Sequence, residues 1–237
     1  MTPEEKRVQE DAIAWARANK KKKARELTDI KSFPPELDPV AVFMAGSPGA
    51  GKTETAEAML EAIGNGVLLI DPDRYRNFFP SYDGTNAWLF QPAVSIIVEK
   101  VLDLAFKNSQ SFILDGTLTN FEKTKSNIER SLRKGRMMQV IYVYQSPLLA
   151  WRFVEAREAL EGRRIRPEDF IEQYFQAREV VNRLKAGFGN KIKVDLIVKN
   201  MDNSMRSYKM GVDVIDHYVL EKFTRADIEK ALGTTGI

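Results

Sequence analysis

Residues 46–53 have types and spacing that bind phosphate. They match the phosphate-loop pattern G-x-x-x-x-G-K-[ST] in full. The glycines permit backbone conformations closed to other residues, so consecutive N–H groups can converge on phosphate oxygens. Lys52 supplies a cation for the β- and γ-phosphates, and the Thr53 hydroxyl is the expected Mg²⁺ ligand. The residues predicted to bind the nucleoside triphosphate are Gly46, Ser47, Pro48, Gly49, Ala50, Gly51, Lys52 and Thr53.

Acidic residues follow two other predicted strands. Asp71 and Asp73 come after the apolar run 67–70, and Asp115 comes after the run 111–114. Parallel strands end at one edge of a sheet, so these carboxylates should face the crevice of the phosphate loop. Phosphoryl transfer needs a carboxylate to accept the hydroxyl proton. We predict Asp73 as this base and Asp115 as a contact to substrate or Mg²⁺-bound water, although Asp71 and Asp115 could equally be strand-end turn formers.

A second cluster of charge is the group of arginines around Gly162. Arginine suits a developing phosphoryl charge because its planar fork stays protonated and can hold two oxygens. A loop of this composition between two helices could close over a nucleotide as a lid, and its alternative is a solvated surface. The arginines of this cluster are Arg157, Arg163, Arg164 and Arg166.

The surrounding elements alternate between strand and helix. This alternation predicts an α/β fold, P-loop kinase-like and three-layered, with a mostly parallel central sheet and an N-terminal helical segment. We assign residues 1–39 to a helix and Pro-rich linker, and residues 40–237 to a kinase domain with a C-terminal hairpin and helix. Strands are predicted at 40–45, 67–70, 111–114, 138–144, 194–198 and near 207–210, and helices at 3–27, 52–63, 91–107, 121–134, 148–161, 168–186 and from 224. The stretch 74–86, rich in aromatic and turn residues, is predicted to be a loop over the site.

Composition bounds the remaining functions. The chain of 237 residues lacks cysteine, which excludes disulfides and thiolate metal sites. No apolar run is long enough to span a membrane, so we expect a soluble, cytoplasmic protein. The net charge of +3 does not indicate a dedicated nucleic-acid binder. The run Lys20 to Lys23 is interpreted as a solvated helix face, with contact to RNA, a membrane or an acidic partner as the alternative. His217 is far in sequence from every motif and is expected to be structural.

Four motifs together resemble the zeta toxin family of kinases over roughly residues 40 to 200. They are G-S-P-G-A-G-K-T, I-D-P-D-R-Y, L-D-G-T and A-R-E-A-L-E-G-R-R-I-R-P. The resemblance implies transfer of phosphate from ATP or GTP to a hydroxyl of UDP-N-acetylglucosamine, and restraint by a separate antitoxin protein. By motif it implies Asp73 as base, with Lys52 and Thr53 holding phosphate and Mg²⁺. It further implies phosphate-facing arginines Arg157 and Arg164 and substrate contacts Glu99, Asp115 and Thr117.

The sequence departs from the family pattern at two places, and two alternative functions are open. The family often has glutamate at the position of Asp115, and the residues after Thr117 lack an arginine that some members place there. A regulatory NTP-binding or hydrolysing module would use Asp73 to orient water instead of a hydroxyl. A kinase acting on nucleic-acid ends or on another small metabolite is the other alternative. The choice between ATP and GTP is not decided by the residues.

Overall fold

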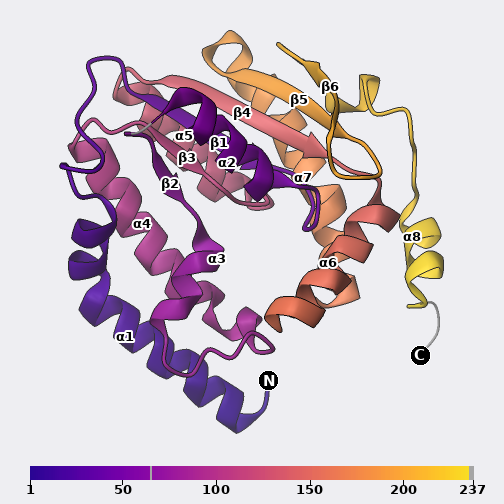
Figure 1. The fold of residues 1–237 in the computed structure, drawn as a ribbon, viewed down its shortest axis with the longest axis horizontal. Helices are drawn as coiled ribbons and strands as arrows, with labels where there is room; N and C mark the ends of the chain where they lie inside the picture. Colours follow the sequence, from indigo (N-terminus) through magenta and orange to yellow (C-terminus); the bar gives the residue numbers. More distant parts are fainter. Residues whose placement is uncertain (65, 235–237) are drawn as a thin grey trace.

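The protein forms a six-stranded sheet with helices on both faces in a computed structural model, which describes residues 1–64 and 66–234 (Figure 1). The strands are β1 Val40–Ala45, β2 Leu68–Ile70, β3 Phe112–Leu114, β4 Met137–Tyr144, β5 Lys193–Lys199 and β6 Met205–Lys209. The helices are α1 Pro3–Leu27, α2 Lys52–Ile63, α3 Pro72–Tyr75, α4 Gln91–Lys107, α5 Phe121–Arg133, α6 Pro147–Glu161, α7 Pro167–Phe188 and α8 Arg225–Leu232. Four short 3₁₀ helices are η1 Arg76–Phe78, η2 Ala87–Phe90, η3 Gly189–Lys191 and η4 Ile215–His217.

The strand order β2-β3-β1-β4-β5-β6 places β1 near the middle of the sheet. β1 pairs in parallel with β3 on one side and with β4 on the other, and only the pair β5–β6 is antiparallel among the described strands. The connection after β1 leads to β2 on one side, and the connection after β3 leads to β4 on the other, so the switch point of the topology lies at the carboxyl ends of β1 and β3. The α/β fold with a mostly parallel sheet, predicted from the sequence, is confirmed.

The two faces of the sheet are covered unequally. Val42, Met44 and Ile141 point to one face, where Ala56 of α2 joins their buried cluster. Alternate residues such as Phe43 point to the other face and enter the larger core with α4, α5 and α7. This alternation follows from the two-residue period of a strand, and burial on both faces explains why these strands read as continuous apolar runs.

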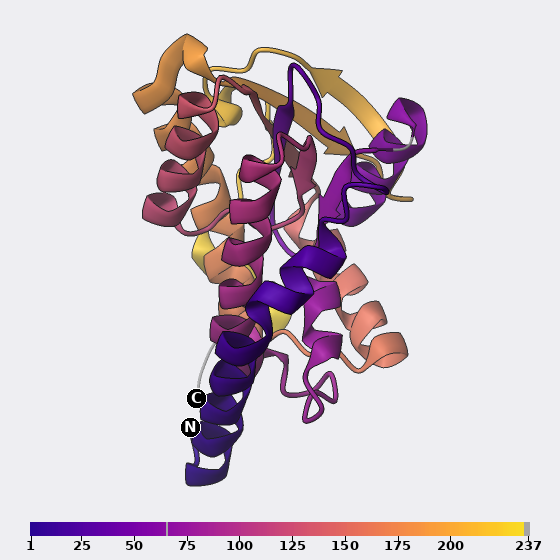
Figure 2. The same cartoon turned by 90° about the vertical axis from the view of Figure 1, so that its left-hand side faces the viewer.

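The N-terminal helix forms where the sequence predicts it. Thr2 caps α1 in a reciprocal pair with Glu5. Its small buried residues Ala12, Ala16 and Ala24 allow close packing on α4, and Figure 2 shows α1 running along the outer side of that helix. The predicted division of the chain at residue 39 stays a prediction, and residues 235–237 of the second unit lie outside the described residues.

The stretch 74–86 is only partly the loop that the sequence predicts, because residues 74–78 are helical and residues 79–86 are turns and irregular backbone. Asp71 caps α3 by accepting a hydrogen bond from the Asp73 N–H at 2.8 Å, and the chain continues directly into η1. The aromatic residues Tyr75 and Phe79 are buried, and the Phe79 ring lies against Trp15 of α1 with centroids 5.1 Å apart. The aromatic side chains therefore anchor this segment to the core instead of covering the site, because burying them removes large apolar areas from water.

Candidate active site

The phosphate loop lies between β1 and α2, at the switch point of the sheet. Gly46 and Gly49 have φ values of 137° and 71°, in the region that favours glycine. A Cβ atom at Gly49 would lie 2.1 Å from the carbonyl oxygen of Ala150, and one at Gly46 would lie 2.3 Å from that of Val143. The loop is thus pressed against β4 and α6, and these two glycines are required by both conformation and space.

Lys52 is buried at the start of α2. Its Nζ atom donates to the carbonyl oxygens of Gly46 at 3.1 Å and Ser47 at 2.7 Å. Burial lowers the pKa of Lys52 to about 8, although Asp115 and Asp73 oppose that change. The ammonium is therefore held inside the loop by two carbonyl oxygens, and the charges of Asp115 and Asp73 favour its protonated form. This is the position at which a cation can bind phosphate.

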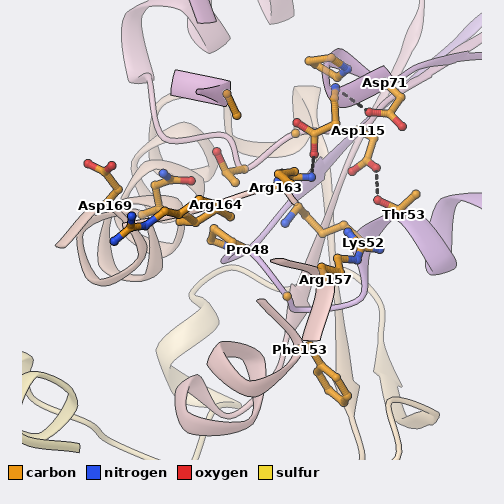
Figure 3. Close-up of a pocket in the computed structure, with 18 of the residues that line it drawn as sticks. Pro48, Lys52, Thr53, Asp71, Asp115, Phe153, Arg157, Arg163, Arg164 and Asp169 are labelled. Atoms are coloured by element: carbon orange, nitrogen blue, oxygen red, sulfur yellow. Dashed lines mark hydrogen bonds and ion pairs between the residues drawn. The ribbon is translucent and has the colours of Figure 1, made fainter. Parts of the chain in front are cut away.

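A hydroxyl and a carboxylate meet beside the loop. Thr53 Oγ1 donates to Asp115 Oδ2 at 2.6 Å (Figure 3). Asp115 follows β3, which pairs with β1, so the sheet itself brings these residues together. Burial raises the pKa of Asp115 against the opposing influence of Lys52 and Thr53. Among residues 1–64 and 66–234 no group of three or more His, Cys, Asp or Glu side chains could hold a metal ion. The hard oxygen donors of Thr53 and Asp115 fit Mg²⁺, which is bound through a few protein groups together with phosphate oxygens.

The two aspartates after β2 have different surroundings. Asp71 is buried, caps α3 and pairs with Arg74 at 3.0 Å. Burial raises the pKa of Asp71, and neighbouring Asp73 adds to that effect. Asp73 is only half-buried and forms ion pairs with Arg76 and with Arg163. Burial would raise the pKa of Asp73, but these two arginines outweigh it and lower the pKa below its ordinary value.

The arginines of the cluster pair with different acidic residues. Arg157 of α6 pairs with Glu54 at 2.8 Å, beside the phosphate loop. Arg163 crosses from the α6–α7 connection to Asp73, and Figure 3 shows it beside Lys52. Arg164 is 64% exposed and lies 3.9 Å from Glu158, so it makes only a loose ion pair. Of the two neighbours in sequence, Arg163 is the one that reaches the Asp73 carboxylate, and the motif-based role of Arg164 as a phosphate-facing arginine stays a prediction.

A cavity of about 730 Å³ unites most of the predicted residues. Its lining includes Asp71, Thr117 and all three of the arginines just described. Glu99 is not among the lining residues: it lies on α4 and forms ion pairs with Lys123 at 3.2 Å and Arg130 at 3.3 Å. The role of Glu99 as a substrate contact is therefore not supported by its position. The predicted residues at the cavity are Pro48, Gly49, Gly51, Lys52, Thr53, Asp71, Asp73, Asp115, Thr117, Arg157, Arg163, Arg164 and Arg166.

Several lining residues were not identified from the sequence. Arg76 lies three residues after Asp73 on a helical turn, and that spacing was a usable signal. Trp88 lies in η2, Gln91 is the first residue of α4, and Asn203 comes from the β5–β6 turn. Asn203 lies so close to the phosphate loop that a Cβ atom added to Gly51 would be 2.5 Å from the Oδ1 atom of Asn203. No pattern in the sequence predicts this contact, because the two residues are far apart along the chain.

No helix among the described residues is long and apolar enough to cross a membrane. His217 is exposed in η4 and does not line the cavity, and the structural role expected for it stays a prediction.

The chain is similar to known proteins in both sequence and structure. A family model described as Zeta toxin matches residues 23–213. None of the curated protein sequences matches the chain significantly. The fold is similar to a structure of the PezAT chromosomal toxin-antitoxin system of Streptococcus pneumoniae, with a TM-score of 0.64 and 16% identity over 99% of this chain and 97% of the other.

Two further structures are similar at lower scores. AvrRxo1-ORF1:-ORF2 with ATP has a TM-score of 0.55 and 15% identity over 98% of this chain and 86% of the other. The Pnkp1/Rnl/Hen1 RNA repair complex has a TM-score of 0.52 and 14% identity, covering 63% of this chain and 47% of that one. At these identities the structural likeness concerns the fold alone.

Proposed function

The chain belongs to the zeta toxin family, and from this premise we propose that it is a small-molecule kinase. It transfers the γ-phosphate of ATP or GTP to a hydroxyl of a nucleotide sugar such as UDP-N-acetylglucosamine. The observation that carries the proposal is the placement of Asp73 and Lys52 on one cavity, with two arginines on the carboxylate. A carboxylate opposite a phosphate loop is the arrangement that transfer to a hydroxyl requires.

Each residue of the site has a chemical task in this mechanism. Lys52 and the loop N–H groups hold the phosphates, and Arg157, Arg163 and Arg164 stand on the cavity wall where charge develops on the transferring group. Asp73 accepts the proton of the attacking hydroxyl. Thr53 and Asp115 would hold Mg²⁺, which neutralises phosphate charge when bound. Asp115 is thus assigned to the metal side of the site instead of to the acceptor.

The wall beyond Asp73 supports a nucleotide sugar as acceptor. Its polar side chains include Asp169, Gln173 and Gln176, whose carboxylate and amides can bond sugar hydroxyls. Trp88 offers a partly exposed ring on which a nucleobase can stack, and the guanidinium of Arg166 lies 5.8 Å from the centre of that ring. A cation beside an aromatic face suits a ligand that joins a base to a diphosphate.

An antitoxin partner is part of the proposal. Two of the similar structures are described as the PezAT toxin-antitoxin system and as the AvrRxo1-ORF1:-ORF2 complex. We infer that a separate chain restrains this protein, which purification together with the product of an adjacent reading frame would test. Loss of phosphorylation on adding that product would support the inference, and unchanged phosphorylation would oppose it.

The decisive experiment is a search for the acceptor by mass spectrometry. Purified protein is incubated with Mg²⁺ and ATP or GTP against nucleotide sugars, free sugars, nucleosides and a 5′-hydroxyl oligonucleotide. We expect a mass gain of one phosphate on a nucleotide sugar, lost in Lys52→Ala and lowered by roughly 10²- to 10⁴-fold in Asp73→Asn. Asp213→Asn is the matched control, because Asp213 is an exposed aspartate away from the cavity.

Other outcomes select the alternatives. Phosphate release to water at a rate that no acceptor changes would replace the kinase by a regulatory NTPase. Phosphorylation of the oligonucleotide alone would assign the protein to kinases of nucleic-acid ends. A Lys52→Ala variant that folds and turns over normally would refute the nucleotide site itself, because the ammonium is the cation of the phosphate loop.

A further inference from the structure

Arg76 is a nearly buried arginine whose partners both stand at the cavity. Its side chain is 10% exposed. One terminal nitrogen, Nη1, donates to Asp73 Oδ1, and the other, Nη2, donates to Gln91 Oε1 at 3.1 Å. A guanidinium taken out of water must find acceptors, and here it finds them on two different elements. Arg76 therefore connects two parts of the cavity wall.

The backbone around Arg76 makes this connection rigid. Asp73 and Arg76 are three residues apart on the continuous turn of α3 and η1, so their side chains share a face. The turn is capped by Asp71 at one end and anchored by the buried ring of Phe79 just beyond the other. Gln91 is the first residue of α4, a long helix of the core. Neither partner can move far without disturbing packed elements.

The charges that face Asp73 come from several elements. Arg76 of η1, Arg163 of the α6–α7 connection and Lys52 of α2 are the cations that lower its pKa. Asp71 after β2 and Asp115 after β3 are the carboxylates close enough to interact with it. Each arginine contacts a different carboxylate oxygen, which leaves every oxygen with a lone pair for a substrate proton.

We propose that Arg76 is a positioning residue for the acceptor: its guanidinium holds the Asp73 carboxylate and the Gln91 amide at a fixed separation. The Asp73 carboxylate then accepts the substrate's proton, while the Gln91 amide donates a hydrogen bond to the same substrate. The inference rests on the proposed kinase function. The acceptor oxygen forms a bond to the γ-phosphorus as its proton passes to Asp73. The bond between that phosphorus and the bridging oxygen breaks, and its electron pair leaves with the nucleoside diphosphate.

The test compares Arg76 with a buried arginine that lies elsewhere. Arg136 donates to the carbonyl oxygens of Gln110 at 2.6 Å and Ala105 at 2.9 Å, at the amino end of β4, and does not line the cavity. Arg76→Met should lower the acceptor kcat/KM by about 100-fold, since a misplaced reacting group costs that much, and change nucleotide Kd by less than about twofold. Arg136→Met should lower the Tm and leave the acceptor kinetics of the folded protein unchanged.

The pH profile separates positioning from simple stability. Removing a cation raises the pKa of Asp73, so the acid limb of kcat/KM should move to higher pH in Arg76→Met. Arg76→Lys keeps the charge but cannot bridge two partners, so we expect about a tenfold loss with the acid limb unmoved. Gln91→Ala should raise the acceptor KM without moving that limb. If Arg76→Met fails to fold, wild-type kinetics in Arg76→Lys and Gln91→Ala would overturn the inference.

A measurement on the ligand-free protein keeps this inference distinct from the proposed function. ¹³C NMR of aspartate carboxyl groups, with Asp73 assigned through Asp73→Asn, follows its titration without any turnover. A higher Asp73 pKa in Arg76→Met than in the wild type supports the contact whether or not an acceptor is known. Acceptor phosphorylation at the wild-type rate in both Arg76 variants would overturn the positioning role and leave the kinase intact. No phosphorylation by the wild type, with the NMR shift present, would overturn the kinase and leave the Arg76–Asp73 coupling.

Discussion

Nucleotide affinity should fall as pH rises through the pKa of Lys52. Burial lowers that pKa to about 8 in the ligand-free protein, whereas an exposed lysine stays charged to far higher pH. Phosphate binds the ammonium and not the neutral amine, so nucleotide binding at a pH above the pKa of Lys52 must first protonate this side chain. The charged fraction falls from about nine-tenths near pH 7 to about one-tenth near pH 9, which predicts an affinity loss of about tenfold, or about 1.4 kcal/mol.

Calorimetry with Mg²⁺ and a non-hydrolysable ATP analogue measures this effect directly. Repeating the titration near pH 8 in buffers of different ionisation enthalpy should show uptake of about half a proton per nucleotide. Lys52→Arg should lose the pH dependence, because arginine stays protonated throughout. Lys199→Met is the control, since burial also lowers the pKa of Lys199 and its Cε lies near Gly51. Flat affinity between pH 7 and 9 with no proton uptake would refute the role of buried Lys52.

Three other changes test the site from different directions. Gly49→Ala should cost about 1–3 kcal/mol of unfolding free energy and abolish nucleotide binding, because its Cβ meets the Ala150 carbonyl. Gly64→Ala is the control, since Gly64 also has a positive φ, 91°, but a Cβ there meets no atom within 4 Å; chemical denaturation and calorimetry measure both variants. Asp115→Asn should reduce the rise in Tm that nucleotide causes in the presence of Mg²⁺ and leave the rise without Mg²⁺ unchanged. An equal Mg²⁺-dependent rise in the wild type and in Asp115→Asn would contradict the metal assignment. Lys52→Met should raise the Tm of the ligand-free protein at pH 7, because a buried ammonium with a lowered pKa destabilises the fold below about pH 8. This destabilisation should decrease as the pH rises from about 8 toward the pKa of Lys52 in the unfolded chain.

The regular elements could be predicted because their signals are local. The apolar run at Val40–Ala45 and the glycine pattern after it specify a buried strand and a tight loop within a few residues of each other. The cap at Thr2 and Glu5 likewise marks the start of α1. The loop prediction was wrong for residues 74–78, which are helical, whereas residues 79–86 lack helix and strand. Tertiary packing decided this difference, because Tyr75 is buried in the core and Phe79 is buried against Trp15 of α1, which is distant in sequence.

The types and spacing of residues 46–53 were sufficient by themselves to identify a phosphate loop, since its glycines, lysine and threonine act through their own backbone and through neighbours in sequence. The order of strands and carboxylates was also enough to direct Asp73 and Asp115 to the same edge of a sheet, as parallel topology requires. Which arginine meets Asp73 was decided only by tertiary structure: Arg163 and Arg164 are adjacent and chemically identical, and only the path of the α6–α7 connection across the cavity turns the first toward the carboxylate and leaves the second exposed.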